Sequence, residues 1–150
     1  MSVESLYQEI ILDHYRAKRN SGLREPYDVE VHHVNPSCGD ELTLRVVVRD
    51  GAIADVSYDA QGCSISQAST SVMTDLVIGG SPEHAMELYD GFQAMIQGQG
   101  KVSLDEDTYE DAVAFEGVAQ FPARVKCAML GWSAVRDGLL RVQVATKEES

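Results

Sequence analysis

Residues 42–62 read LTLRVVVRDGAIADVSYDAQG, and this stretch decides the fold class. Leu42, Leu44, Val46 and Val48 alternate with mostly polar residues, which is the period of a β-strand that buries one face. The pair Asp50-Gly51 is typical of a tight hairpin turn. The second half of the stretch repeats the strand pattern. The sequence therefore predicts two antiparallel strands joined by a hairpin.

Another strand and a helix are predicted before this hairpin. Val29, Val31 and His33 alternate as in a strand, and the turn-forming letters NPSCGDE at residues 35–41 separate them from the hairpin. Residues 3–18 repeat apolar side chains at helical spacing. The economical interpretation is one helix followed by a three-stranded antiparallel meander.

The chain after the hairpin is predicted to be helical. Apolar residues recur at helical spacing from residue 65 until Gly79-Gly80, a good helix stop. Ser81-Pro82-Glu83 supplies an N-cap, a first-turn proline and a first-turn acid, so a second helix starts there. A last helix is expected after Pro122, with Gly138 as a point where it could end or kink.

Residues 97–120 are rich in Gly, Gln, Asp and Glu and are predicted to form a long acidic insertion, with a short helix near 108–115. The simplest interpretation of its acids is a solvated face, because the spaced acids and glycine of a calcium loop are missing. Strands first and helices later indicate the α+β class. We expect one domain over residues 1–150, with a three-stranded antiparallel sheet packed against several helices.

The formal net charge of −12 argues against nucleic acid and anionic membrane surfaces as partners, and solubility explains it most simply. The opening MSVESLYQEI shows no secretory signal, and no stretch reaches the 18 apolar residues of a membrane helix. We therefore expect a cytoplasmic protein. In that compartment its three cysteines stay reduced.

The residues that carry chemistry are grouped in three short segments. They are Cys38-Gly39-Asp40, Gly62-Cys63-Ser64 and Lys126-Cys127, each at a chain reversal or an element end. Three thiolates and one carboxylate suit zinc. Arg124 and Lys126 could offset the surplus negative charge of such a site. Without a CxxC pair, however, the spacing equally allows three buried free cysteines and an ordinary turn aspartate.

The histidines are weaker candidates for a site. His32 and His33 are adjacent on a strand, so their side chains point to opposite faces and cannot serve one site. His14 and His84 lie in helical patterns, and all four histidines are interpreted as structural or surface residues. Trp132 and Tyr109 are interpreted as packing residues.

Four long segments make the sequence resemble the U-type iron–sulfur cluster assembly family, which includes IscU and the N-terminal domain of NifU. They read LYQEIILDHYRAKRNSG (6–22), NPSCGDELTL (35–44), AQGCSISQASTSVM (60–73) and FPARVKCAMLGW (121–132). The resemblance covers nearly the whole chain and is closest to the SufU branch. It implies that Cys38, Asp40, Cys63 and Cys127 are the metal ligands.

Two departures from the IscU pattern favour the SufU branch. Lys126 stands where IscU scaffolds carry a histidine, and the gap from Cys63 to Cys127 is longer than in the scaffolds. The chaperone-docking LPPVK sequence of IscU also appears only in the altered form FPARVK. The SufU resemblance implies a zinc-dependent sulfurtransferase that accepts persulfide sulfur from a SufS-type cysteine desulfurase.

This resemblance suggests a role for Cys38 and Arg124 and suggests which proteins act with this chain. Cys38 would accept the sulfur, because its glycine-containing turn leaves it free to move, and Arg124 would orient the partner or neutralise the transferred sulfur. A SufBCD-type assembly complex would lie downstream. The alternatives are an IscU-like scaffold that builds and transfers a [2Fe–2S] cluster on the same ligands, and a structural zinc protein that only activates the desulfurase.

Overall fold

A three-stranded antiparallel sheet in the order β1-β2-β3 forms one layer of the fold. The computed structural model describes residues 3–36 and 39–149, with side chains described over 5–36 and 39–143. The strands are β1 (Val29–Asn35), β2 (Asp40–Arg49) and β3 (Ala52–Gln61). The β2–β3 register continues as far as the pair Glu41 and Gln61. The predicted meander and the turn at Asp50-Gly51 are confirmed.

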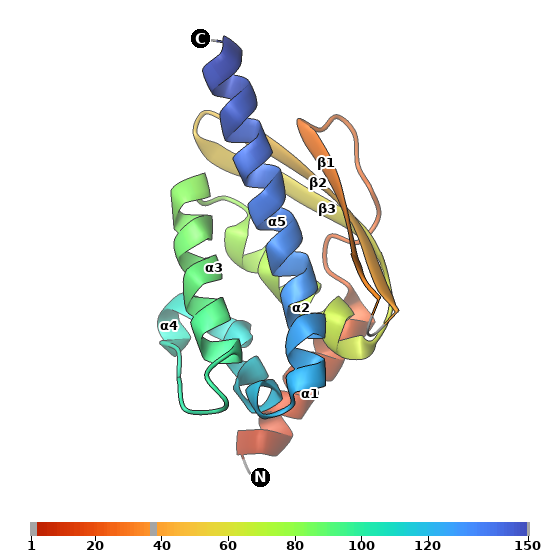
Figure 1. Cartoon of the computed structure of the whole chain (residues 1–150), viewed down its shortest axis with the longest axis vertical. Coiled ribbons are helices and arrows are strands. Elements are labelled where there is room, and N and C mark those ends of the chain that lie inside the picture. Colours follow the sequence, from red (N-terminus) through yellow and green to blue (C-terminus); the bar gives the residue numbers. More distant parts are fainter. Residues whose placement is uncertain (1–2, 37–38, 150) are drawn as a thin grey trace.

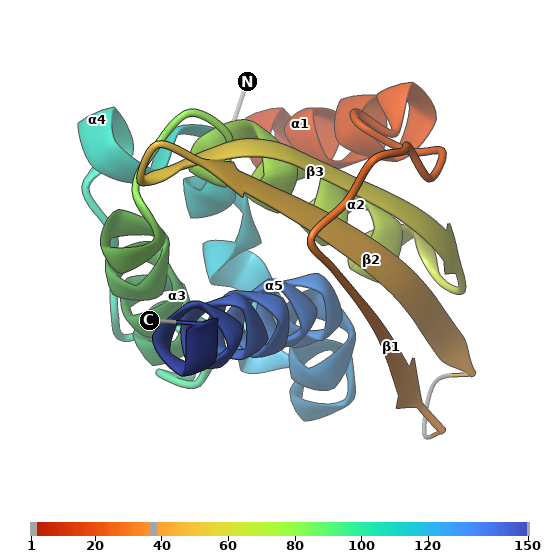
Figure 2. The same ribbon diagram turned by 90° about the horizontal axis from the view of Figure 1, so that it is seen from above.

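One face of this sheet is covered by helices (Figure 2). The helices are α1 (Val3–Ala17), α2 (Ser64–Val77), α3 (Pro82–Ile96), α4 (Glu106–Tyr109), the 3-10 helix η1 (Glu110–Gln120) and α5 (Pro122–Glu149). α5 packs against β1 and β2, and α2 packs between α1 and α5. α5 runs the length of the molecule, and its last turns extend beyond the sheet (Figure 1). The α+β single-domain prediction is thus confirmed.

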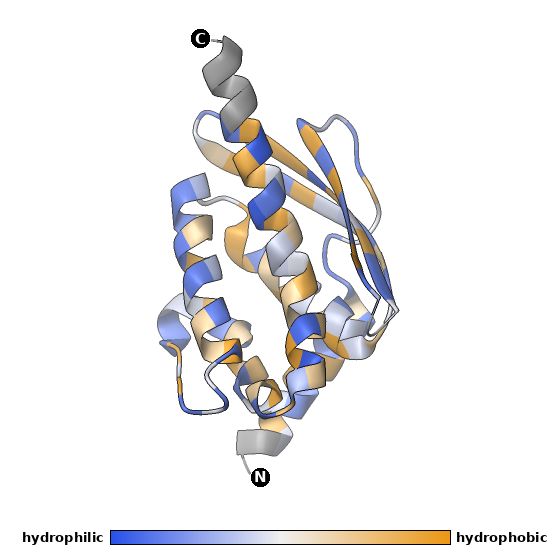
Figure 3. Cartoon of the chain, viewed as in Figure 1, coloured by the Kyte–Doolittle hydropathy of each residue, from blue (hydrophilic) through white to orange (hydrophobic). Residues whose placement is uncertain are grey.

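The core lies between the sheet and the helices. Leu42, Leu44 and Val46 on β2 are fully buried, whereas the residues between them are not. Colouring by hydropathy shows the same alternation along the strands (Figure 3). On the helical side, Trp132 of α5 stacks on Phe92 of α3 with ring centroids 4.6 Å apart. The interpretation of Trp132 as a packing residue is confirmed.

The sequence explains where α3 begins and why α5 continues past Gly138. The Ser81 hydroxyl accepts a hydrogen bond of 3.1 Å from the backbone N–H of His84, so Ser81 is the N-cap predicted for α3. α5, by contrast, does not end at Gly138. A Cβ at Gly138 would lie 3.2 Å from a Val46 methyl carbon, so the glycine allows close packing on the sheet.

The segment 97–120 differs most from its prediction. The acids of its first part, as far as Asp111, are exposed as predicted, but η1 then buries its apolar side chains. The buried residues are Ala112, Val113, Ala114, Phe115, Val118 and Ala119. The rings of Phe115 and Phe92 pack edge-on, with centroids 6.0 Å apart. The second half of this segment is therefore part of the core, which the composition of the segment did not predict.

No helix in the described part of the chain combines the length and the apolar character needed to cross a membrane.

Candidate metal centre

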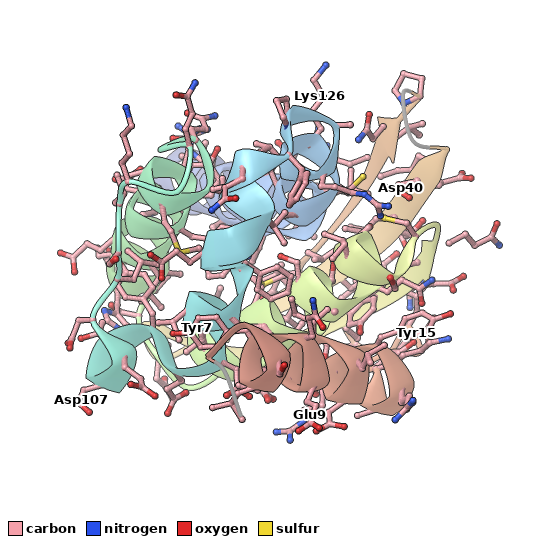
Figure 4. All side chains as sticks on the ribbon, turned by 90° about the horizontal axis from the view of Figure 1, so that it is seen from below. Tyr7, Glu9, Tyr15, Asp40, Asp107 and Lys126 are labelled. Atoms are coloured by element: carbon pink, nitrogen blue, oxygen red, sulfur yellow. The ribbon has the colours of Figure 1, made fainter. Side chains whose placement is uncertain are left out.

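Three segments that are distant in the sequence meet at one end of the sheet. Asp40 opens β2, Cys63 precedes α2, and Cys127 lies in the second turn of α5. One carboxylate oxygen of Asp40 and the two Sγ atoms all lie within 4.8 Å of one another. Figure 4 shows sulfur atoms beside Asp40 at the end of the strand. The structure thus brings together three of the four residues suggested as metal ligands.

Local structure fixes Cys63. Glu41 pairs with Gln61 across the sheet, so the end of β3 passes directly beside Asp40 before the chain turns into α2. Cys63 is the N-cap of that helix, with extended backbone angles, and its Sγ accepts from the Ser66 N–H at 3.5 Å. A sulfur at this position faces the positive end of the helix.

Close contact between α2 and α5 fixes the position of Cys127. The Ser69 hydroxyl of α2 donates a hydrogen bond of 2.7 Å to the carbonyl oxygen of Ala128. Further along, a Cβ at Gly131 would lie 3.1 Å from the Thr70 Cα, so the glycine lets the two helices approach. Cys127 is 2% exposed, and its thiol donates to the carbonyl of Ala123 at 3.6 Å. Both cysteines are therefore held by helical backbone.

The burial of the Asp40 carboxylate suits this site to a cation. This side chain is 0% exposed. Its Oδ1 accepts a hydrogen bond of 2.9 Å from the Cys63 N–H, whereas its Oδ2 lies 3.9 Å from Cys63 Sγ. Among the described residues no Lys, Arg or His side chain forms an ion pair with Asp40. A buried carboxylate without a cationic partner is costly, so the site is suited to a bound cation.

The donor set fits a thiophilic ion. Ligand atoms around a tetrahedral zinc, at roughly 2.0–2.3 Å from it, are separated by about 3.3–3.8 Å. The 3.9 Å between Asp40 Oδ2 and Cys63 Sγ is close to that separation. Thiolates select zinc, copper(I) or iron–sulfur chemistry rather than magnesium or calcium.

The remaining suggested site residues are less constrained. Cys38 lies outside the described residues. Arg124 and Lys126 are both exposed, and neither forms an ion pair with any residue that the structure describes. Figure 4 shows Lys126 projecting outward on the side where Asp40 lies. The structure therefore places the two cations near the cluster without assigning either of them a contact in it.

Sequence reasoning missed a groove beside this cluster. It has a volume of about 530 Å³ and lies between α1, η1 and the starts of α2 and α5. Ser64, directly after Cys63, and Arg124, one turn before Cys127, form part of its wall. Tyr7 and Phe121 also line it, and Phe121 is 59% exposed. An exposed aromatic in the altered FPARVK sequence was the signal available for this groove.

The histidines occupy structural or surface positions, as predicted. His14 is 3% exposed and bonds to Ser71 and Asp111, while His33 bonds to Asp137 on α5. His32 and His84 are exposed.

The chain is similar over most of its length to proteins of iron–sulfur cluster assembly. The zinc-dependent sulfurtransferase SufU of Bacillus subtilis is 36% identical over 93% of this chain and 93% of its own length. The iron–sulfur cluster assembly scaffold protein IscU of Streptococcus pyogenes serotype M1 is 38% identical over 91% of this chain and 84% of its own. A Fervidobacterium islandicum AW-1 structure, assigned as an iron–sulfur cluster assembly scaffold for the SUF system, superposes with a TM-score of 0.81 at 33% identity, covering 92% of this chain and 99% of that one.

Residues 6–140 match the family of NifU-like N-terminal domains. This match spans the strands, α2 and the part of α5 that carry Asp40, Cys63 and Cys127. The chain therefore belongs to the NifU-like N-terminal domain family.

Proposed function

We propose that this chain acts in iron–sulfur cluster assembly as a zinc-dependent sulfur acceptor and activator of a SufS-type cysteine desulfurase. The observation that carries the proposal is the buried Asp40 carboxylate, which faces two cysteine sulfurs and has no cation among the described residues. The Bacillus subtilis relative supports the same activity through its name, zinc-dependent sulfurtransferase SufU.

In this proposal zinc is held by Asp40, Cys63 and Cys127, with Cys38 as the fourth ligand. When bound, zinc keeps the cysteine sulfurs as thiolates at neutral pH. Cys63 and Cys127 are the fixed ligands, because one caps α2 and the other is buried within α5. Cys38, which lies outside the described residues, is proposed as the ligand that moves, because the sequence places it beside Gly39 in a turn.

The transfer itself is a thiolate exchange. The Cys38 thiolate attacks the terminal sulfur of the desulfurase cysteine persulfide. A new sulfur–sulfur bond forms on Cys38, the bond to the desulfurase cysteine breaks, and that cysteine leaves as a thiolate. The electrons balance within this exchange, so no separate oxidant or reductant is required. Cys38 then carries the persulfide onward, to a SufBCD-type complex in our proposal.

Arg124 is proposed to orient the desulfurase or to neutralise the transferred sulfur. It lines the groove beside the cluster, and no ion pair within the described part of the chain occupies its guanidinium. Phe121, in the same groove, offers an exposed apolar surface to a partner. A bound protein segment would therefore meet both an apolar contact and a cation close to the reacting sulfurs.

The test is desulfurase turnover with cysteine, followed by mass spectrometry of this protein. We expect about one zinc per chain, faster turnover when the protein is added, and a persulfide on Cys38. Cys38→Ala should abolish activation, and Arg124→Ala should reduce activation while zinc stays bound. Lys101→Ala, which changes an exposed lysine away from the cluster, is the matched control. A persulfide mainly on Cys127 would contradict the choice of acceptor, and none on any cysteine would contradict sulfur transfer.

The second candidate is a scaffold for a [2Fe–2S] cluster. It is favoured by the Streptococcus pyogenes relative, which is named a scaffold and is as similar to this chain as the sulfurtransferase is. Lys126 weighs against it, because a protonated lysine cannot serve as a ligand where IscU scaffolds have a histidine. Reconstitution with iron and sulfide, followed by visible spectroscopy and transfer to an apo-acceptor, separates the two. A cluster passed intact would establish the scaffold.

A further inference from the structure

Gly62 lies directly across the sheet from Asp40. The β2–β3 ladder ends with Glu41 opposite Gln61, and the next position in the same register sets Asp40 opposite Gly62. Side chains at opposite positions of an antiparallel pair stand about 4.5–5.5 Å apart, side by side. Because Gly62 has no side chain, the Asp40 carboxylate can extend over it toward the sulfurs.

The space at Gly62 is completely taken by Asp40. A Cβ added to Gly62 would overlap the Asp40 carboxylate and lie 2.9 Å from the Asp40 Cα. Gly62 also has a φ of +142°, a conformation that residues with side chains rarely adopt. While Asp40 keeps its position, a residue with a side chain at position 62 would overlap the Asp40 carboxylate, and it would also have to adopt an unfavourable φ.

The same arrangement limits how Asp40 can bind. Its Oδ1 is engaged by the Cys63 N–H at 2.9 Å, directly after Gly62. Only Oδ2 remains directed at the sulfurs, 3.9 Å from Cys63 Sγ. A carboxylate held in this way offers one oxygen. Calcium commonly uses both oxygens of a carboxylate, whereas a four-coordinate zinc needs one.

We infer that Gly62 is a positioning residue that seats Asp40 as a one-oxygen ligand and so favours a four-coordinate, thiophilic ion in the site. The inference deepens the proposed function and rests on it only in taking Asp40 as a metal ligand. Gly62 touches no substrate and acts through Asp40.

A double-mutant cycle on Gly62 and Asp40 tests this, with zinc affinity measured by chelator competition and ligand geometry by cobalt(II) absorption. Gly62→Ala should weaken zinc binding about 10–100-fold, the range for groups that orient metal ligands. Asp40→Ala should weaken it at least as much. The double variant should bind about as well as Asp40→Ala alone, because the glycine then has no carboxylate to seat. Gly79→Ala is the control, since Gly79 has a φ of +93° and open space around it.

The outcomes separate this inference from the proposed site. Wild-type zinc affinity in Gly62→Ala, with weakened affinity in Asp40→Ala, would overturn the positioning role alone. Wild-type affinity in Asp40→Ala would remove Asp40 from the ligands and overturn the proposed site. If Gly62→Ala folds poorly, the inference is tested instead by the free energy of unfolding of the metal-free proteins, measured in urea. The stability lost through Gly62→Ala should be smaller when Asp40 is already alanine, and an equal loss in both backgrounds overturns the inference.

Discussion

Two clusters of polar side chains in this protein differ in their chemistry, because one brings together sulfur and carboxylate groups and the other joins an imidazole to its hydrogen-bond partners. The metal cluster is Asp40, Cys63 and Cys127. The histidine cluster is His14 of α1, Ser71 of α2 and Asp111 of η1. Each cluster joins three segments far apart in the sequence, and each includes a polar side chain with no more than 3% of its surface exposed.

In the histidine cluster the groups complete one another. His14 Nε2 donates to the Asp111 carboxylate at 2.8 Å, and His14 Nδ1 lies 2.9 Å from the Ser71 hydroxyl. The Ser71 oxygen also accepts from the Arg19 backbone N–H at 3.0 Å. These distances are those of good hydrogen bonds. Nothing further is needed to balance the buried imidazole, so the cluster stabilises the packing of α1 on α2 and η1.

In the metal cluster two sulfurs and a carboxylate oxygen face one another within 4.8 Å. Among the described residues the sulfurs make contacts of 3.5–3.9 Å, and the Asp40 carboxylate accepts a hydrogen bond of 2.9 Å from the Cys63 N–H. Two sulfurs and a carboxylate oxygen within 4.8 Å of one another are a donor set suited to a thiophilic metal ion, whereas an imidazole, a hydroxyl and a carboxylate at hydrogen-bond distance satisfy one another. The kind of donor atom and the spacing of the donors, rather than burial, therefore distinguish the candidate metal centre from the histidine cluster.

The largest expected effect removes a ligand from the metal cluster. Cys63→Ala deletes a thiolate and the N-cap of α2. Zinc affinity should fall by more than the roughly 10–100-fold that is typical when a group hydrogen-bonded to a metal ligand is removed. Chelator competition and metal analysis of the purified protein measure this. Zinc retained at the wild-type affinity would show that the cluster is not the site, and the contrast between the two clusters would lose its meaning.

The converse substitution tests the histidine cluster. His14→Ala opens a cavity and leaves the buried Ser71 hydroxyl without its imidazole, so the free energy of unfolding should drop by about 2–4 kcal/mol. Zinc binding by the folded variant should be unchanged. Urea unfolding with and without chelator measures both quantities. His84→Ala, at an exposed histidine, is the control and should stay within about 0.5 kcal/mol. Loss of zinc in His14→Ala would mean that the two clusters are coupled.

Much of the architecture could be predicted from the sequence because its signals are local. The alternation at residues 42–48, the Asp50-Gly51 turn and the Ser81-Pro82 helix start each depend on neighbouring residues, and each is confirmed. Asp40, Cys63 and Cys127 could be grouped because each stands beside a turn or a helix start. That they would share one site became an expectation only through resemblance to a family.

Long-range packing could not be predicted. η1 follows a run of acids, and a 3-10 helix repeats about every three residues, so its apolar side chains do not show the period of an α-helix. The histidine cluster joins residues 57 and 97 positions apart, so no local pattern reveals it. The one available signal was that His14 falls on the apolar stripe of α1. Gly62 reads locally as a turn residue, and only the sheet register shows that it faces Asp40.

The smallest expected effect comes from a third polar cluster, which is fully paired but half-exposed. Asp137 on α5 accepts from His33 Nε2 at 2.9 Å and from Arg141 Nε at 3.0 Å. The hydrogen bond from His33, helped by Arg141, lowers the pKa of Asp137 below its usual value of 3.8. A carboxylate with a depressed pKa in the folded state stabilises the fold above its unfolded pKa, and this stability is lost as the pH falls through the folded pKa.

Asp137→Asn should therefore lower the free energy of unfolding at pH 7 by at most about 1 kcal/mol, since solvent screens the pair. The difference from wild type should shrink as the pH falls below about 4 and vanish once Asp137 is protonated in both states. Asp59→Asn on β3 is the control, because Asp59 is exposed and has no ion pair among the described residues. Urea unfolding at several pH values measures the difference. If Asp137→Asn lowers the free energy of unfolding as much as His14→Ala does, burial of the cluster matters less than its pairing. If the decrease does not depend on pH, the charge of Asp137 does not stabilise the contact between β1 and α5.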